Sequence, residues 1–511
     1  MKNIKYIFLA MISLTIANSC SNFEELNTNP DAAASVSPQM LATQVLKDAY
    51  RFWNPNATDF ATGNLWCKHT ALTETNPNPY QYQYSYWPYG GFGSYKKLTD
   101  LKRMVEFSVG TPYESSFGGL ELFMKASYGF GSTLDMGDVP YSEAGMAEDG
   151  ITQPKYDKQA DVFASVLTDL KAAEEKFAAG TNFGTCDIMF GGDVVKWRRL
   201  CNAMQLKVLQ TMSKKITADQ KARFAAIVSA GNLMTGNADN FELKYSDNPN
   251  STHPYWNGES KRITNAVSKL VVDELIRLQD RRLFYFAEPA QALINGGLLE
   301  NDYNAYAGAP TQLSADQLAL NNQSGQYSLI NKRYVAVKAG DPMIKFTYAE
   351  QCFIIAEAIE EGWVTGNAQT YYENGVKAML SYYMTLPSAS TGTHGMAINQ
   401  TYIDGYFAGA AAYATAGTKT DRLHQIWMQR WLIDFFQGNG LNYPQFLRTG
   451  YPEFPLNPAT SMNPDDNTVF PKRWKYPTDE QVSNPVNYKK AIDDQFGGYD
   501  GINEIPWYLQ N

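Results

Sequence analysis

Residues 345–380 read KFTYAEQCFIIAEAIEEGWVTGNAQTYYENGVKAML and predict two helices joined by a tight turn. Apolar or small residues recur at intervals of three and four along each half, as they do on one face of a helix. They are Phe346, Ala349, Phe353 and Ala356 in the first half, and Tyr371 or Tyr372, Gly375 and Ala378 or Met379 in the second. Gly362 and Gly366 bracket the turn. Small residues at a helix crossing allow close approach, so we expect a packed helical pair.

This pair has about the length of one tetratricopeptide unit, a repeat of roughly 34 residues. A plain αα-hairpin is the alternative, because the repeat signature in residues 345–380 is incomplete. The chain shows no clean period over its whole length, so any repeat array must be degenerate.

The same helical period dominates the rest of the chain. In residues 193–216, for example, one face carries Trp197, Cys201, Met204, Val208 and Thr211. Similar segments are found near 40–53, 92–109, 116–134, 157–178, 264–280, 342–362, 367–385 and 421–437. We therefore predict a mainly α fold of tetratricopeptide-like helix pairs, with few short strands and long irregular loops.

The first 19 residues, MKNIKYIFLAMISLTIANS, have the layout of a secretory signal peptide. Lys2 and Lys5 precede an apolar run too short to span a bilayer comfortably. Cys20 follows directly, which predicts lipidation of the new N-terminal thiol, with ordinary secretion as the alternative. Later segments lack the ~20 consecutive apolar residues of a membrane span, so we expect membrane attachment through the lipid anchor only.

The composition limits the classes of partner that the chain can bind. Lys and Arg number 43 against 52 Asp and Glu, a net charge of −9 without a basic cluster, which argues against nucleic acid and anionic lipid. Four further cysteines, Cys67, Cys186, Cys201 and Cys352, form no Cys-x-x-Cys motif. We expect Cys201 and Cys352 to be buried free thiols, although a single disulfide remains open.

Catalytic motifs are missing from the sequence. The four histidines lie in no metal-binding spacing, and no nucleophile elbow, phosphate-binding loop or dinucleotide fingerprint occurs. We therefore predict no cofactor, no metal site and no enzymatic activity. A glycoside hydrolase remains the enzymatic alternative and requires two carboxyl groups ~5–10 Å apart. Isolated loop acids could also bind calcium.

Long loops rich in Asn, Pro, Gly and Tyr separate the helices, and loops of this length are commonly functional. Residues 76–98, NPNPYQYQYSYWPYGGFGSYKKL, concentrate aromatic side chains among Asn and Gln. Flat rings suit the apolar faces of sugars, while packing against the helices is the alternative for each ring. The predicted glycan-binding residues are Tyr80, Tyr82, Tyr84, Trp87, Trp256, Tyr303 and Tyr306.

Several blocks, taken together, resemble the SusD/RagB family of outer-membrane nutrient-binding lipoproteins of Bacteroidetes. They are FEELNTNPDAAASVSPQMLAT after Cys20, MGDVPYSEA at 136–144, GDVVKWRRLCNAMQLKV at 192–208, FTYAEQCFIIAEAIEEGW at 346–363, RTGYPEFP at 448–455 and FPKRWKYPTDEQVSNPVNY at 470–488. Glu24 and Glu25 behind Cys20 are similar to the acidic signal that directs such lipoproteins to the cell surface.

The resemblance implies a single SusD-like domain over residues 20–511, with a loop-rich ligand-binding subdomain inserted in the helical scaffold. It also implies a lipid-anchored protein of the cell outer membrane, facing outside, that delivers a nutrient to a SusC-like TonB-dependent transporter. The family has no universal binding residues, so no contacts transfer by motif. A glycan ligand is the leading hypothesis; peptide uptake and a purely structural transporter subunit are alternatives.

Overall fold

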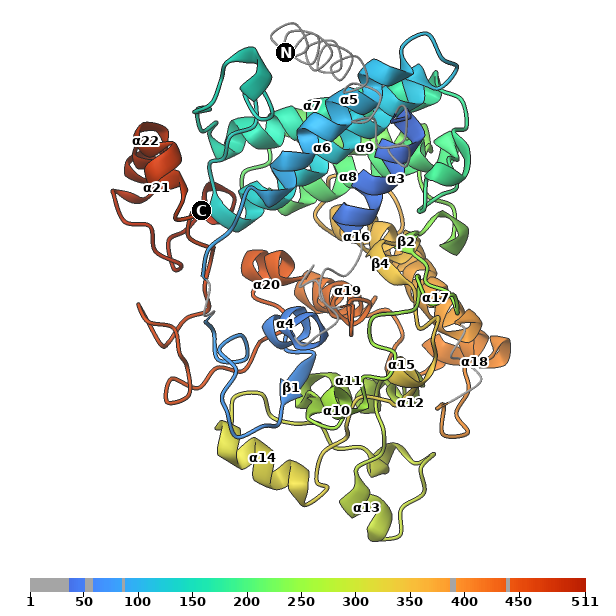
Figure 1. The fold of residues 1–511 in the computed structure, drawn as a ribbon. Coiled ribbons are helices and arrows are strands. Elements are labelled where there is room, and N and C mark those ends of the chain that lie inside the picture. The colour runs from blue at the N-terminus through green and yellow to red at the C-terminus, as the bar shows by residue number, and fades with distance from the viewer. Residues whose placement is uncertain (1–35, 51–57, 85–87, 387–391, 438–441) are drawn as a thin grey trace, which may run out of the picture.

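The computed structural model describes residues 36–50, 58–84, 88–386, 392–437 and 442–511. The predicted signal segment, Cys20, Glu24, Glu25 and Trp87 lie outside the described residues. Helices dominate the described part, and strands are short and few, as predicted (Figure 1). None of the helices in these ranges is long and apolar enough to cross a membrane.

Six helices from the first half of the chain form a layered bundle at the top of Figure 1. They are α3 (Pro38–Tyr50), α5 (Leu98–Ser108), α6 (Glu114–Met136), α7 (Gln159–Ala178), α8 (Val194–Thr211) and α9 (Ala218–Ala230). Four of the five residues on the predicted face of α8 are buried, and Met204 is half-buried. The helix begins where Asp193 accepts a hydrogen bond from the Val195 N–H at 2.9 Å.

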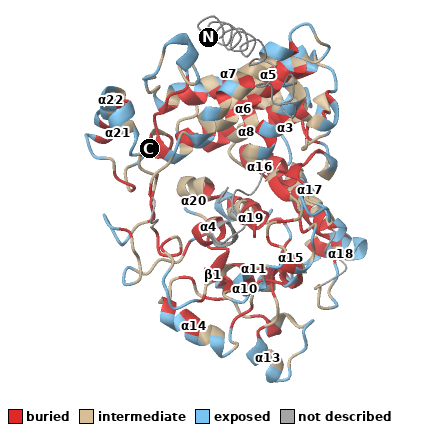
Figure 2. Ribbon diagram, in the orientation of Figure 1, coloured by how far each residue is buried: buried red, intermediate tan, exposed pale blue. Residues whose placement is uncertain are grey.

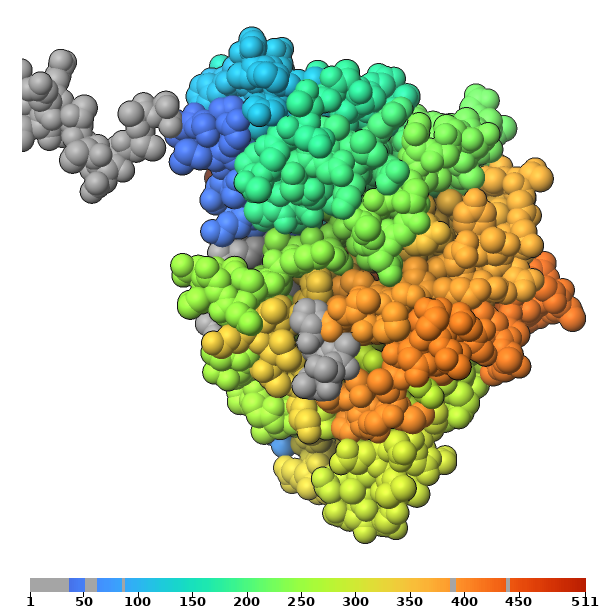
Figure 3. All heavy atoms as spheres, turned by 90° about the vertical axis from the view of Figure 1, so that its right-hand side faces the viewer, coloured from blue at the N-terminus to red at the C-terminus, as the bar shows by residue number. Residues whose placement is uncertain are grey.

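The second half of the chain forms most of the lower part of the molecule, around its own apolar cluster, and α4 (Thr58–Trp66) of the first half joins it there (Figures 1 and 3). Its longer helices are α11 (Lys269–Leu278), α14 (Ala315–Gln323), α17 (Ala368–Thr385) and α19 (Lys419–Leu432). Shorter ones are α10 (Glu259–Arg262), α12 (Arg282–Phe286), α13 (Gln291–Asn295), α15 (Arg333–Ala336), α18 (Gln400–Gly405) and α20 (Tyr443–Thr449). Figure 2 shows exposed surface on peripheral α13 and α18, and on α22 (Pro485–Phe496), which follows α21 (Glu480–Ser483) near the C-terminus.

Two short antiparallel strand pairs connect distant segments. Strand β1 (Thr70–Leu72) pairs with β3 (Asn265–Val267), and β2 (Phe241–Leu243) pairs with β4 (Met343–Phe346). The helices predicted to begin at 264 and 342 were therefore placed too early at their N-terminal ends. The β3 and β4 strands are followed by Ser268 and Thr347, whose hydroxyls accept N–H groups of the next helix and mark its beginning.

Helix α16 (Tyr348–Glu360) is shared by both halves. Its Phe353 and Ala356 belong to the apolar cluster of the lower part, whereas Ile354 and Ile355 belong to the cluster of the N-terminal bundle. A helix with two buried faces reads as apolar nearly all round, as this one does. This helix therefore connects the two cores, together with strands β2 and β4, which also contribute residues to both clusters.

The predicted helical pair is confirmed as α16 and α17. Gly362, with φ +73°, follows the first helix in the left-handed region, where glycine costs least. At the crossing, a Cβ on Gly375 would lie only 2.7 Å from Cε1 of Phe353, so the helices approach more closely than any larger residue permits.

The four cysteines in the described ranges are free thiols. Cys201 and Cys352 are buried within helices, as predicted. Burial raises the pKa of the Cys201 thiol well above its usual value and that of Cys352 to about 12. Both side chains therefore serve as small apolar groups.

Candidate functional site

The first aromatic loop follows β1 and is held by hydrogen bonds within residues 78–84. Asn78 accepts the Tyr80 N–H through its side chain at 3.0 Å, and the Pro79 carbonyl accepts the N–H groups of Tyr82 and Tyr84 at 2.9 Å each. Gln83 has φ +61° and gives the loop its tight turn. The alternating tyrosines consequently face different surroundings.

Tyr82 points into the protein. Its ring is 2% exposed, its hydroxyl donates to the Leu313 carbonyl at 2.8 Å, and its own carbonyl accepts the Met462 N–H at 2.7 Å. Burial raises the pKa of the Tyr82 hydroxyl to about 12. Tyr82 thus attaches the loop to two distant segments and offers little surface to a ligand, whereas Tyr80 and Tyr84 remain half-buried.

Tyr80 belongs to an aromatic cluster centred on Trp66, the last residue of α4. The ring centroid of Trp66 lies 6.0 Å from that of Tyr80, 5.2 Å from Tyr443 and 5.1 Å from Trp474. Trp66 itself is 6% exposed, while the other three rings are half-buried. We call these four residues the Trp66 cluster. Three partly exposed rings around a buried indole form a surface that can stack on an apolar ligand face.

Separate segments bring these rings together. Tyr443 begins α20, and its hydroxyl donates to the Pro471 carbonyl at 2.8 Å, which orients its ring. Trp474 lies in the extended C-terminal segment, where its N–H donates to the Asp135 carbonyl at the end of α6 at 2.7 Å. The cluster therefore combines α4, α20, the loop 78–84 and the C-terminal segment, which is attached to the end of α6.

Polar groups lie beside these rings. The Asp135 side chain keeps exposed surface, yet enough protein surrounds it that burial raises the pKa of its carboxyl to about 7. Within the described part of the chain, the Trp66 Nε1–H and the nearby Tyr508 hydroxyl are buried without a hydrogen-bond partner. Orphaned buried donors are uncommon in proteins and call for an explanation, such as a bound ligand or ordered water.

The second predicted loop presents one ring. Tyr255 is buried against Phe436, with centroids 5.0 Å apart, whereas Trp256 is half-buried. Lys338 places its Nζ 5.0 Å from the Trp256 ring centroid, a cation–π contact that covers part of the indole. The next residue, Asn257, has φ +65° and ends the turn.

Both tyrosines of the third predicted loop pack on Phe284, with centroids 4.8 Å from Tyr303 and 5.1 Å from Tyr306. Their hydroxyls donate to main-chain carbonyls, that of Tyr303 to Gln279 at 2.7 Å and that of Tyr306 to Glu300 at 2.8 Å. Tyr306 is 3% exposed and Tyr303 half-buried. Tyr306 therefore stabilises the loop and leaves little surface for a ligand.

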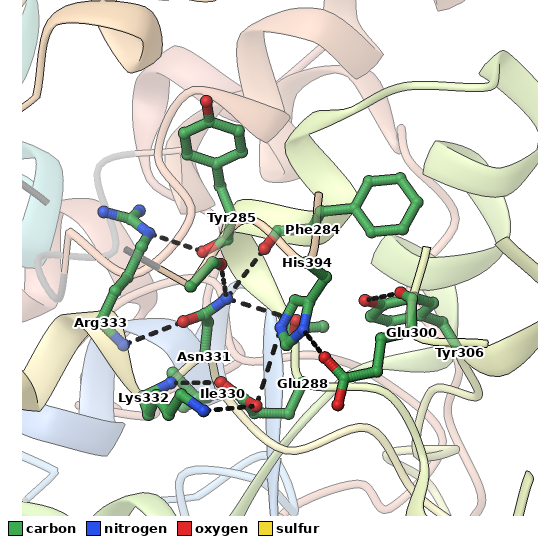
Figure 4. A network of polar contacts seen from close by, with 12 residues as sticks. Phe284, Tyr285, Glu288, Glu300, Tyr306, Ile330, Asn331, Lys332, Arg333 and His394 are labelled. Atoms are coloured by element: carbon green, nitrogen blue, oxygen red, sulfur yellow. Dashed lines mark hydrogen bonds and ion pairs between the residues drawn. The ribbon is translucent and has the colours of Figure 1, made fainter. Parts of the chain in front are cut away.

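A polar network next to Tyr306 explains why this loop is so well packed (Figure 4). His394 Nδ1 lies 2.9 Å from the Glu300 carboxylate, which lowers the pKa of that carboxyl, and Nε2 lies 3.7 Å from Glu288. Asn331 donates to the carbonyls of Phe284, at 2.8 Å, and Gly392, at 2.6 Å. The network joins three distant segments, so its primary effect is structural.

The structure does not unite all the predicted site residues. Among the described residues, no ring contact joins Tyr80, Trp256 and Tyr303. The sequence interpretation overlooked Trp66, Tyr443 and Trp474. Tyr443 and Trp474 lie in residues 438–477, one of the long segments rich in Asn, Pro, Gly and Tyr, and Trp66 ends a helix that carries no amphipathic signal. No group of three or more His, Cys, Asp or Glu side chains in the described ranges could hold a metal ion.

Comparisons with known proteins identify the family of this chain. Residues 30–477 match the SusD-like family model described as starch-binding and associating with the outer membrane. A SusD homologue from Bacteroides fragilis is 34% identical over 93% of this chain and 100% of its own, with a TM-score of 0.87. A second homologue from the same organism is 30% identical over the same shares, with a TM-score of 0.81.

A further solved structure, a chitin-binding protein, is 25% identical over 93% of this chain and 100% of its own, with a TM-score of 0.72. No curated protein matches the sequence. The family model and the two homologues cover most of the chain in one continuous match. The chain therefore belongs to the SusD-like family, which is described as starch-binding and associating with the outer membrane.

Proposed function

We propose that this protein is a cell-surface glycan-binding lipoprotein that delivers its ligand to a TonB-dependent transporter of the SusC type in the outer membrane. Cys20 would carry the lipid anchor after removal of residues 1–19, and the domain would extend over residues 20–511. The family description and the chitin-binding relative support a glycan ligand.

The observation that carries the proposal is the Trp66 cluster. Tyr80, Tyr443 and Trp474 surround Trp66, and each of the three residues keeps part of its surface exposed. Aromatic faces bind the C–H faces of sugars. Asp135, whose main-chain carbonyl accepts the Trp474 N–H, also carries a carboxyl that can accept hydrogen bonds from sugar hydroxyls. The structure thus combines apolar stacking with a directional polar group.

The proposal is for binding without catalysis, and it gives none of the described residues a catalytic role. The test is a screen of the mature chain against a panel of polysaccharides and peptides, with release of reducing ends followed in the same samples. Saturable binding to a polysaccharide without release is the expected result. Release of sugar would establish a glycoside hydrolase, and binding to peptides alone would establish peptide uptake; either outcome overturns the proposal.

A further inference from the structure

One cavity of the protein shares no residue with the Trp66 cluster. It has a volume of about 380 Å³. Its lining comes from strand β2 and the residues around it, from the loop 339–342 and from the C-terminal end of α17. The residues that matter for its chemistry are Asn237, Glu242, Lys244 and Tyr382. In Figure 3 these three parts of the chain, coloured green, yellow and orange, adjoin on the face turned to the viewer.

Glu242 lies in the middle of β2 and is only 7% exposed. Its Oε1 is 3.3 Å from Nζ of Lys244, whose side chain is 73% exposed, whereas its Oε2 has no hydrogen-bond partner. Burial raises the pKa of the Glu242 carboxyl, and Lys244 opposes that effect. A buried carboxylate oxygen without a partner is costly, so this residue is not explained by packing alone.

Tyr382 and Asn237 bring two more incomplete polar groups to the same cavity. Tyr382 is 6% exposed, and its hydroxyl lies close enough to the Glu242 carboxyl to lower the pKa of Glu242, although the two groups make no hydrogen bond of normal geometry. Asn237 donates through Nδ2 to the Ala378 carbonyl at 2.8 Å, which fixes its amide, while its Oδ1 is buried and has no partner. Three neighbouring polar groups in one cavity therefore have unused capacity.

The hydrogen-bond acceptors and donors that remain unused indicate the class of ligand. Glu242 Oε2 and Asn237 Oδ1 can only accept hydrogen bonds, and the Tyr382 hydroxyl can donate or accept. The charges of Glu242 and Lys244 offset each other, so neither a strong anion nor a strong cation is favoured. The best complement is a neutral molecule with several hydroxyl groups. The volume lies within the usual range of small-molecule sites, roughly 300–1,000 Å³.

We propose that this cavity is a second saccharide subsite that binds one or two sugar rings, with hydroxyl groups donating to Glu242 and Asn237 and paired with the Tyr382 hydroxyl. The subsite rests on the proposed glycan-binding function and adds to it a site for a short sugar, separate from the Trp66 cluster. The unpartnered atoms carry almost no accessible surface, so the ligand reaches them after small rotations of the Glu242 and Tyr382 side chains.

The experiment titrates the mature chain with maltose, cellobiose, mannobiose and N,N′-diacetylchitobiose, using saturation-transfer NMR. The variants are Glu242→Gln and Tyr382→Phe, each of which alters one polar group and keeps the shape. Tyr383→Phe is the matched control, because Tyr383 is 2% exposed, adjoins Tyr382 in α17 and does not line the cavity. Trp474→Ala reports separately on the Trp66 cluster, and thermal unfolding checks that every variant is folded.

One of the four disaccharides is expected to bind the wild type, with affinity lowered about tenfold or more by Glu242→Gln and Tyr382→Phe, as for the loss of a hydrogen bond to a charged group. Tyr383→Phe and Trp474→Ala should leave this binding unchanged. The subsite is refuted if none of the disaccharides binds, or if binding is lost only in Trp474→Ala. It is also refuted if Tyr383→Phe weakens binding as much as Tyr382→Phe. If no disaccharide binds the wild type while Trp474→Ala weakens polysaccharide binding, the proposed function stands and the second subsite is refuted.

Discussion

Arg448 and Glu357 form a two-pronged ion pair between α20 and α16, with Nη1–Oε1 at 2.5 Å and Nη2–Oε2 at 3.0 Å. Their side chains are 6% and 2% exposed. Gln210 of α8 donates to the same carboxylate at 2.6 Å. One buried carboxylate thus connects the N-terminal bundle, the central helix and the helix that begins with Tyr443 of the Trp66 cluster.

Neutralising this carboxylate should destabilise the protein strongly. We expect Glu357→Gln to lower the free energy of unfolding by about 3–5 kcal/mol, because it leaves the Arg448 guanidinium buried without its counter-charge. The control is Glu361→Gln, four residues on, whose exposed ion pair with Lys419 at 2.8 Å should contribute less than about 1 kcal/mol. Urea unfolding measures both, and equal losses in the two variants would contradict a special role for the buried pair.

Because α16 and α17 approach closely, one added methyl group at their crossing should destabilise the protein. Gly375→Ala should lower the free energy of unfolding by about 1–3 kcal/mol, since the new Cβ meets Phe353 at 2.7 Å. Gly131→Ala is the matched control inside α6, where a Cβ meets nothing within 4 Å and a gain of about 0.5–1 kcal/mol is expected. Thermal unfolding of the two variants should shift in opposite directions; a stabilising Gly375→Ala would show that the crossing is loose.

His69 should make stability fall in acid. The side chain is 1% exposed, its Nε2–H donates to the Trp431 carbonyl at 3.0 Å, and burial lowers its pKa to about 3. In the unfolded chain its pKa is near 6.5, so as the pH falls below 6.5 the unfolded state binds a proton that the folded state refuses. The stabilising contribution is complete above pH 6.5 and is lost progressively down to about pH 3.

The measurement compares the wild type with His69→Gln, which keeps a donor for the Trp431 carbonyl but cannot be protonated. Between pH 6.5 and 4.5 the wild type should lose about 2–3 kcal/mol more than the variant. Buried Asp138 and Asp434, whose pKa values burial raises to about 7, act in the opposite direction in both proteins and cancel in the comparison. Parallel pH profiles for the two proteins would exclude the titration of His69 as the cause.

The helical scaffold could be predicted because its signals are local. The spacing in α8 and the glycines around the α16–α17 turn report directly on which face is buried and where a helix ends. Strands β3 and β4 were read as parts of helices because each has only three or four residues and is defined by a partner far along the chain. Pairing over such distances leaves no periodic trace in so short a segment.

Only part of the candidate site could be predicted from the sequence. Composition drew attention to the loop that contains Tyr80, but the burial of Tyr82 depends on its bond to Leu313, 231 residues later. Trp66 and Trp474 meet only in the folded chain, and neither lies in a motif that indicates binding. Which of several similar aromatic residues becomes surface and which becomes core is decided by tertiary contacts.

The most direct test of the glycan-binding account is the affinity of Trp474→Ala and Trp256→Ala for the polysaccharide that binds the wild type. Both residues are half-buried tryptophans, but only Trp474 belongs to the Trp66 cluster. We predict that Trp474→Ala weakens binding about tenfold or more, as expected for truncating an aromatic anchor, and that Trp256→Ala leaves binding nearly unchanged. Unaltered binding by Trp474→Ala, with loss in Trp256→Ala, would contradict the account and move the site to the loop around residue 256.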